Sequence, residues 1–293
     1  MTLKNTFLSD GLVVSFELFP PKTTKGETAL YKHVSELMKF NPDFVTCTYG
    51  AGGSTRDKTL EIVGKIKNDF DVPVASHLTL VGSTVDDLRQ YLTTAQQQGV
   101  DYIVALRGDP PKGQENFSQT EGGLRYANEL VELIEAEFPD FGVLVAGYPE
   151  KHCEAPTMEL DLENLKRKVD AGADAIVTQV FFHNDDFFRF RDRCQALGIE
   201  APVVPGILPV TSLSQIERIA SLCGANVPES FLKRLGEKED KEWQFEVGVE
   251  FAIEQTRALI DADVAGIHYY VLNQSPATIK ILEAVDILSL IHI

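Results

Sequence analysis

The sequence of 293 residues has few cysteines, and none of the four (Cys47, Cys153, Cys194 and Cys223) forms a C-x-x-C pair. Their scattered positions argue against a disulfide framework or a zinc site and favour reduced thiols in a cytoplasmic protein. The chain also lacks any run of about eighteen apolar residues, and its first residues lack the apolar segment of a signal peptide. We therefore expect neither a membrane span nor secretion.

Basic residues are scarce, since 27 Lys and Arg stand against 44 Asp and Glu, for a net charge of −17. A chain this acidic repels polyanions, so nucleic acid is not an expected partner, although one local basic pocket for a phosphate fits this balance. The composition is otherwise that of a folded protein, 44% apolar and 24% charged. The length suits one α/β barrel or two smaller domains.

Short apolar runs alternate with amphipathic stretches along the chain, and the runs are nearly continuous, as in parallel strands buried on both faces. The predicted strands are Val13–Phe19, Asp43–Tyr49, Val72–Thr79, Tyr102–Arg107, Gly142–Tyr148, Ala175–Phe182, Pro202–Leu208 and Gly266–Leu272. Helical patterns lie between them, with Thr84 and Asp87 placed for a capping box and Gly99, Gly172 and Gly198 for helix ends. The alternation predicts a (β/α)₈ TIM barrel formed as a single domain by residues 1–293.

Residues 226–264, before the last predicted strand, interrupt this alternation. They contain a charged turn and a long helix from about Trp243 to Ala262, which we interpret as an insertion within the same domain. A doubly wound open sheet is the alternative fold, and it usually carries a G-x-G-x-x-G turn after a strand. The glycine-rich segment Gly50–Gly53 does not have that spacing, so the barrel is favoured.

The carboxyl ends of barrel strands are where chemistry is expected. The first strand carries Glu17 between two apolar residues, where burial should raise the pKa of its carboxyl group and suit it to general acid catalysis. The alternative is a structural glutamate paired with a buried cation. The third strand carries His77, for which a hydrogen-bonded core histidine is the alternative.

The fourth strand ends in Arg107-Gly108-Asp109, which could hold a phosphate or planar anion and tune a neighbouring ring. An ion pair between Arg107 and Asp109 is the alternative. The helix after the fifth strand offers a polar face for a ribose and a diphosphate, or for solvent alone, made of Asp161, Asn164 and Lys168 with Arg167 beside them.

The sequence lacks the key residues of two classes of barrel enzyme. A Schiff-base aldolase needs a lysine within a strand, and none of the predicted strands contains one. A metal-dependent hydrolase needs clustered ligands, whereas Glu17, His77 and Asp109 come from separate strands. The pattern favours acid-assisted chemistry on a bound organic cofactor.

Nine motifs, in order along the chain, resemble those of methylenetetrahydrofolate reductases. They are Phe16-Glu17-Leu18-Phe19-Pro20-Pro21, Thr48-Tyr49-Gly50-Ala51, His77-Leu78-Thr79, Leu106-Arg107-Gly108-Asp109, Tyr148-Pro149-Glu150-Lys151-His152, Leu165-Lys166-Arg167-Lys168, Thr178-Gln179, Pro205-Gly206-Ile207-Leu208-Pro209 and His268-Tyr269-Tyr270-Val271-Leu272-Asn273. Each motif alone is common, but nine in register make the resemblance specific.

The resemblance implies a TIM barrel that binds FAD without a Rossmann motif. In that family, NADH or NADPH passes hydride to the flavin and leaves, and 5,10-methylenetetrahydrofolate then takes its place and is reduced to 5-methyltetrahydrofolate. Glu17 would be the acid that protonates a folate nitrogen. Asp109 would lie beside the pyrimidine edge of the flavin, tune its hydride affinity and touch the pterin.

The resemblance also implies the remaining contacts. The flavin would be bound by Thr48, Tyr49, Ala51, His77, Arg107, Gly108, Asp109, Tyr126, Ala127, Tyr148, His152 and Ala155, with Asp161, Asn164, Arg167 and Lys168 on its ribose and diphosphate side. Gln179, Gln215 and Tyr270 would line the pocket shared by folate and nicotinamide, together with Glu17 and Asp109. A cytoplasmic homo-oligomer in one-carbon metabolism and methionine biosynthesis is expected.

The chain departs from the family pattern at a few positions. Leu18 and Val271 replace the usual Phe and Thr, and Gln274 stands where relatives carry a basic residue that could pair with a folate carboxylate. The chain ends soon after the last helix, so inhibition by adenosylmethionine through a C-terminal regulatory domain is not expected. Two other functions fit the same residues: a flavoprotein acting on another one-carbon carrier or imine, and a non-catalytic, partner-binding barrel.

Overall fold

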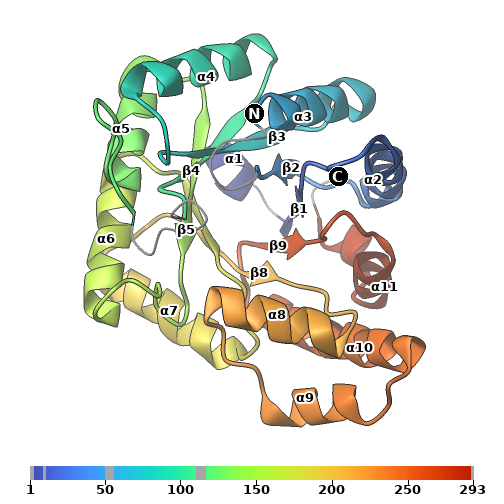
Figure 1. Cartoon of the computed structure of the whole chain (residues 1–293). Helices are drawn as coiled ribbons and strands as arrows, with labels where there is room; N and C mark the ends of the chain where they lie inside the picture. The colour runs from blue at the N-terminus through green and yellow to red at the C-terminus, as the bar shows by residue number, and fades with distance from the viewer. Residues whose placement is uncertain (1–2, 9–10, 50–55, 110–116, 292–293) are drawn as a thin grey trace.

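The computed structural model describes residues 3–8, 11–49, 56–109 and 117–291. Its strands form one parallel sheet in the order β7-β6-β5-β4-β3-β2-β1-β9-β8, and helices surround them (Figure 1). The strands are β1 (Val13–Leu18), β2 (Phe44–Cys47), β3 (Val74–Thr79), β4 (Tyr102–Leu106), β5 (Gly142–Gly147), β6 (Ala175–Thr178), β7 (Val203–Val204), β8 (Gly206–Ile207) and β9 (Gly266–Tyr270). Each of them lies within a predicted strand.

The two ends of this sheet are joined through Pro205. Strand β7 pairs with β6, whereas β8 pairs with β9, and only Pro205 separates β7 from β8. Proline has no N–H to donate to a ladder, but its carbonyl accepts a hydrogen bond from His268 N at 3.0 Å. The two short strands are therefore one barrel strand interrupted at a proline, so the predicted eight-stranded TIM barrel is confirmed.

The helices follow the predicted alternation. They are α1 (Leu3–Leu8), α2 (Thr24–Leu37), α3 (Arg56–Phe70), α4 (Val85–Gln97), α5 (Ala127–Glu137), α6 (Met158–Asp170), α7 (Asn184–Ala196), α8 (Leu213–Cys223), α9 (Glu229–Gly236), α10 (Lys241–Asp261) and α11 (Pro276–Ala284), with 3₁₀ turns at η1 (Met38–Phe40) and η3 (Ile287–Ser289). Thr84 and Asp87 form the predicted capping box of α4. Gly99, Gly172 and Gly198 have positive φ angles after α4, α6 and α7, as predicted for helix ends.

The barrel interior is packed at its amino end. Leu3 from α1 meets Phe44, Tyr102 and Val204 there, in a cluster of fully or almost fully buried side chains. A second, larger cluster fills the space between the sheet and the helices. Because the amino end is closed by apolar side chains, ligands are expected at the carboxyl ends of the strands.

The insertion contains two helices, α9 and α10, whereas the sequence predicts only the second. The long helix α10 contacts both α7 and α11, so it takes a place in the outer ring between them (Figure 1). Helices α8 and α9 are held against it by a separate apolar cluster in which Phe231 stacks on Phe251 at 3.9 Å. This cluster fixes α8 beside the end of the seventh barrel strand.

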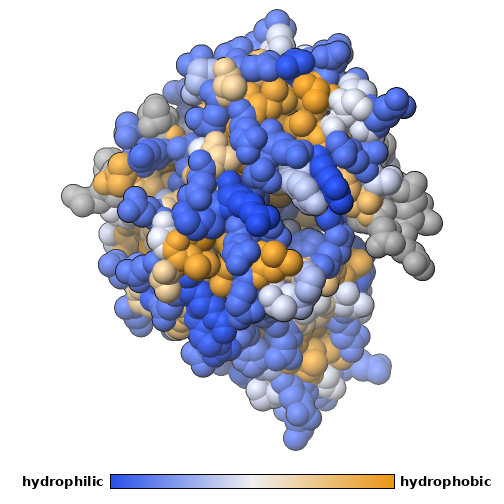
Figure 2. Space-filling model, turned by 90° about the vertical axis from the view of Figure 1, so that its left-hand side faces the viewer, coloured by the Kyte–Doolittle hydropathy of each residue, from blue (hydrophilic) through white to orange (hydrophobic). Residues whose placement is uncertain are grey.

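The surface shown in Figure 2 is largely hydrophilic, and its hydrophobic side chains gather in separate patches. Among the residues that the structure describes, no helix has both the length and the hydropathy needed to cross a bilayer.

Candidate active site

A cavity of about 510 Å³ opens at the carboxyl ends of the strands. It is lined from many strands at once and by one side of α8. The predicted site residues on its wall are Glu17, Thr48, Tyr49, His77, Arg107, Gly108, Asp109, Tyr148, His152, Gln179 and Tyr270. These residues are spread over more than 250 positions of sequence, and barrel closure brings them to one site.

Glu17 lies on the cavity wall between two histidines. Its Oε2 atom is 3.2 Å from Nε2 of His77 and 3.6 Å from Nε2 of His268. The other ring nitrogen of His268 lies 2.8 Å from the hydroxyl of Ser15. If the hydroxyl donates to this nitrogen, the His268 proton is on Nε2 and points at the carboxylate. The result is a buried polar chain from Ser15 through His268 to Glu17.

The expected direction of the Glu17 pKa is wrong. Burial of the carboxyl group does raise its pKa, as the sequence predicted. The charge of His77 and the side-chain contacts of His268 and His77 outweigh burial, and they lower the pKa from 4.5 to about 2. Its pKa therefore lies well below neutral pH, which favours the carboxylate form of Glu17. Neither histidine was foreseen as its partner, because they lie 60 and 251 residues away in sequence.

Arg107 is paired with Glu154 and not with Asp109. Its guanidinium donates to both carboxylate oxygens of Glu154, at 2.6 and 2.7 Å, and this two-pronged contact fixes its orientation. Asp109 is exposed at the cavity edge. Between them, Gly108 has a φ of +87°, and a Cβ added there would lie 2.8 Å from Cβ of Thr79. Only glycine fits this backbone without displacing the neighbouring strand end.

Tyr270 and Gly206 shape the opposite wall. The Tyr270 hydroxyl donates to the carbonyl of Thr178 at 2.7 Å, and a Cβ added at Gly206 would come within 2.3 Å of that carbonyl oxygen. The missing side chain therefore lets Tyr270 cross from β9 to the end of β6. Burial raises the pKa of Tyr270 well above its usual value, so it is a neutral hydrogen-bond donor.

The other predicted site residues that the structure describes are not among those that line the cavity. Tyr126 is half-exposed at the start of α5, followed by Ala127, and the carbonyl of Ala155 accepts from Lys151 Nζ at 2.5 Å. Gln215 accepts from the backbone N–H of Thr211 at 2.7 Å through its side chain. Ala51 lies outside the described residues.

Two of the four polar residues predicted on α6 point toward the cavity side, and the other two are exposed. Asp161 accepts from the backbone N–H of His152 at 2.9 Å, and Lys168 donates to the carbonyl of Ala146 at 2.5 Å, so both point toward the cavity side. The ammonium group of Lys168 is buried although its side chain is partly exposed, and this burial lowers its pKa to about 8. Arg167 donates a hydrogen bond to Oδ1 of Asn164 at 3.0 Å, and both residues are exposed.

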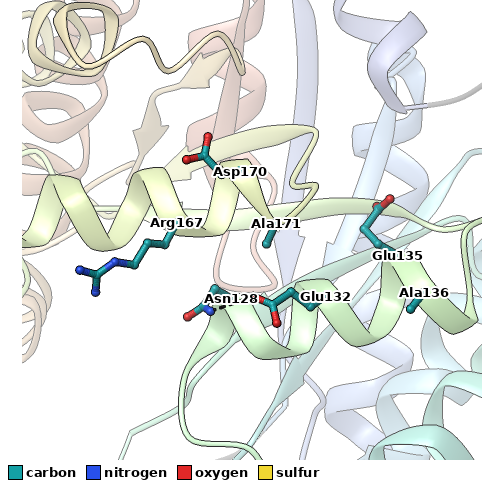
Figure 3. Close-up of a pocket in the computed structure, with 7 residues that line it drawn as sticks. All are labelled: Asn128, Glu132, Glu135, Ala136, Arg167, Asp170 and Ala171. Carbon is teal, nitrogen blue, oxygen red and sulfur yellow. Dashed lines mark hydrogen bonds between the residues drawn. The ribbon is translucent and has the colours of Figure 1, made fainter.

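Arg167 borders a larger, open hollow of about 630 Å³ on the outside of the barrel (Figure 3). This hollow lies between α5 and α6, and its other polar side chains are mainly acidic, including Glu132, Glu135 and Asp170. It contains none of the strand-end residues, and its acidic side chains disfavour a diphosphate. The candidate active site is therefore the smaller cavity.

Several cavity residues were missed by the sequence reading. Thr46 and His268 line the cavity beside Glu17, and Arg218, Leu222 and Cys223 line it from α8. The signal for His268 was its position on the eighth predicted strand, which a closed barrel places next to the first. No comparable signal existed for α8, because its position depends on the packing of α9 and α10.

Comparison with known proteins identifies relatives of the whole chain. Residues 3–286 match the family described as "Methylenetetrahydrofolate reductase". The chain is 38% identical to 5,10-methylenetetrahydrofolate reductase of Escherichia coli (strain K12) over 275 residues, which cover 94% of this chain and 90% of that protein. It is also 38% identical to "Methylenetetrahydrofolate reductase (NADH) 1" of Arabidopsis thaliana over 279 residues, 92% of this chain and 47% of that protein. The chain thus spans about half the length of the plant relatives it matches.

Among solved structures, an uncharacterized protein from Clostridium thermocellum superposes with a TM-score of 0.68 at 16% identity, over 98% of this chain and 99% of that one. It is described as binding two copies of 5-methyl-5,6,7,8-tetrahydrofolic acid. At this identity, the similarity supports the fold.

Proposed function

The chain belongs to the methylenetetrahydrofolate reductase family, and we propose that it is a flavin-dependent enzyme that reduces 5,10-methylenetetrahydrofolate to 5-methyltetrahydrofolate with NADH or NADPH. The observation that carries this proposal is the buried Glu17 carboxylate on the wall of a strand-end cavity. The names of the relatives support the reaction, and the folate ligand of the Clostridium protein supports the substrate class.

The cavity residues fit a flavin. Thr48, His77 and Arg107 offer hydrogen-bond donors along three neighbouring strand ends, and Gly108 leaves room for a flat ring to approach the backbone. Lys168 and Asp161, on α6, would hold the ribose and diphosphate side. When bound, a flavin supplies the capacity to accept a hydride from a nicotinamide and to donate it to a folate.

Glu17 would act on the folate. The contacts with His77 and His268 favour its ionised form. Flat organic rings entering the cavity displace water, and this desolvation favours the neutral carboxyl form. A protonated Glu17 can then give its proton to a folate nitrogen, which opens the one-carbon bridge to a cation that accepts hydride.

Gln179 and Tyr270 would position the folate. Gln179 lines the cavity near the end of β6, and its amide offers both a donor and an acceptor for a pterin edge. Tyr270 presents its ring to the same cavity while its hydroxyl is held by Thr178. Gln274 is exposed just after β9 and carries no charge, so folate carboxylates receive no ion pair from this position.

The test is a pair of half-reactions on the purified protein. We expect yellow flavin absorbance, either as isolated or after reconstitution with FAD. NADH or NADPH should bleach this absorbance without oxygen, and methylenetetrahydrofolate should restore it. A colourless protein that cannot be reconstituted would favour the non-catalytic barrel. A protein that nicotinamide bleaches but folate does not restore would favour a flavoprotein acting on another imine.

A further inference from the structure

Thr46 on β2 lines the cavity and has a buried hydroxyl group. The residue is 1% exposed, and its Oγ1 has no hydrogen-bond partner among the residues that the structure describes. Buried hydroxyls nearly always have a partner, because burying one unpaired costs free energy. Because Thr46 lines the cavity, a molecule in the cavity is the partner available to its hydroxyl.

Thr46 is the strand partner of Glu17. The two residues are paired in the β1–β2 register, and both line the cavity. Neighbouring strands lie about 4.8 Å apart, and no hydrogen bond between these two side chains is found in the described structure. The contacts of Glu17 with His77 and His268 both use Oε2. The Glu17 carboxylate and the Thr46 hydroxyl are thus two polar groups on one wall, and two is the least that a bound water needs.

We propose that Thr46 is a positioning residue for Glu17: its hydroxyl holds a water molecule against the carboxylate, and this water returns a proton to Glu17 in each catalytic cycle. The inference rests on the proposed function. Reduction of the one-carbon bridge requires one hydride, which comes from the reduced nicotinamide, and one proton. Glu17 gives its proton to the folate nitrogen. The water then takes a proton from solvent as it passes one to Glu17, so no hydroxide is left behind, and Thr46 is unchanged.

The histidine contacts explain why Glu17 needs a nearby source of protons. They favour the ionised form of Glu17, so a proton lost to the folate is regained more readily when a donor is in contact with the carboxylate. His77 and His268 hold Oε2 and keep the side chain in place, while Ser15 orients His268 from behind. Water held by Thr46 reaches the carboxylate from the neighbouring strand without disturbing these contacts.

The discriminating variant is Thr46→Val, which keeps the shape of the side chain and removes only the hydroxyl. Because that hydroxyl has no partner in the described protein, its loss should not lower the melting temperature of the ligand-free protein. The matched control is Thr278→Val, since Thr278 on α11 is also fully buried with an unpartnered Oγ1 but does not line the cavity. Thr46→Ser retains the hydroxyl and should rescue the effect.

The experiment measures melting temperature, flavin affinity and the two half-reactions of the flavin-loaded protein. We expect Thr46→Val to slow reoxidation by methylenetetrahydrofolate about tenfold to a hundredfold, the effect of one hydrogen bond to a charged group. Its flavin affinity and its reduction by nicotinamide should stay within about twofold of the unmodified chain, as should both half-reactions of Thr278→Val. Thr46→Ser should recover most of the folate rate.

Several outcomes of this experiment would overturn the inference. Among them are an unchanged folate rate in Thr46→Val, equal slowing of both half-reactions, loss of flavin, and no rescue by serine. A Thr46→Val protein that melts earlier while Thr278→Val does not would also overturn it, because the hydroxyl would then have a structural partner. If the unmodified chain is not reoxidised by folate at all, the proposed function itself fails, and the two failures are distinguishable.

Discussion

Replacing Glu17 with glutamine should remove most of the stability that the fold gains from the charge of this carboxylate. The carboxyl group has a pKa of about 2 in the folded protein against 4.5 for its ordinary value. One pKa unit corresponds to about 1.4 kcal/mol, so the ionised carboxylate stabilises the fold by about 3 kcal/mol. Because the pKa is lowered by folding, this contribution is complete above pH 4.5 and is lost as the pH falls toward 2.

The assay is urea unfolding of the ligand-free protein at pH 6.5 and pH 3. By linkage, about 2 kcal/mol of the Glu17 contribution is lost at pH 3. The free energy of unfolding of the unmodified chain should therefore fall between these pH values by about 2 kcal/mol more than that of Glu17→Gln. Other carboxyl groups titrate in both proteins, so this difference isolates Glu17.

The matched control is Glu250→Gln. Glu250 pairs with Arg234 at 2.6 Å, but its side chain is 52% exposed, so its charge should contribute less than about 1 kcal/mol. If the unmodified chain and Glu17→Gln lose stability in parallel on acidification, the histidine contacts do not stabilise the Glu17 charge and the reasoning fails. In the flavin-loaded protein, Glu17→Gln should keep reduction by nicotinamide and lose reoxidation by folate. A variant that turns over folate at a near-normal rate would contradict the acid role.

Gly108→Ala should destabilise the chain by about 1–3 kcal/mol more than Gly122→Ala. Both glycines have a positive φ angle. A Cβ added at Gly108 would lie 2.8 Å from Thr79, whereas nothing lies within 4 Å of a Cβ added at Gly122. Equal melting temperatures of the two variants would argue against a tight backbone approach at the cavity edge. Glu154→Gln should change the free energy of unfolding by less than about 1 kcal/mol, because its pair with Arg107 is partly exposed. The same variant should weaken flavin binding, measured by titration of the apoprotein with FAD, because the guanidinium loses its fixed orientation; unchanged affinity would show that Arg107 does not hold the flavin.

The sequence predicted the barrel because the pattern that identifies it is local. A run such as Tyr102–Leu106 is apolar at successive positions because both faces of its strand are covered, and the helix after it has one apolar side for the same reason. These requirements act on each segment separately, so they can be counted along the chain without knowing which strands become neighbours. The same local logic placed Glu17 and Arg107 at strand ends.

The tertiary structure decided which of those polar groups meet, and so decided their charge states. Glu17 was expected to have a raised pKa, because its sequence neighbours are apolar, and it has a lowered one because closure brings His77 and His268 to its carboxylate. Arg107 pairs with Glu154, which follows a different strand. Electrostatic and hydrogen-bond energies depend on distances across the barrel, and these are set by strand register and not by sequence spacing. The residues available for catalysis are therefore determined by the sequence, whereas the protonation state and the partners of each one are determined by the fold.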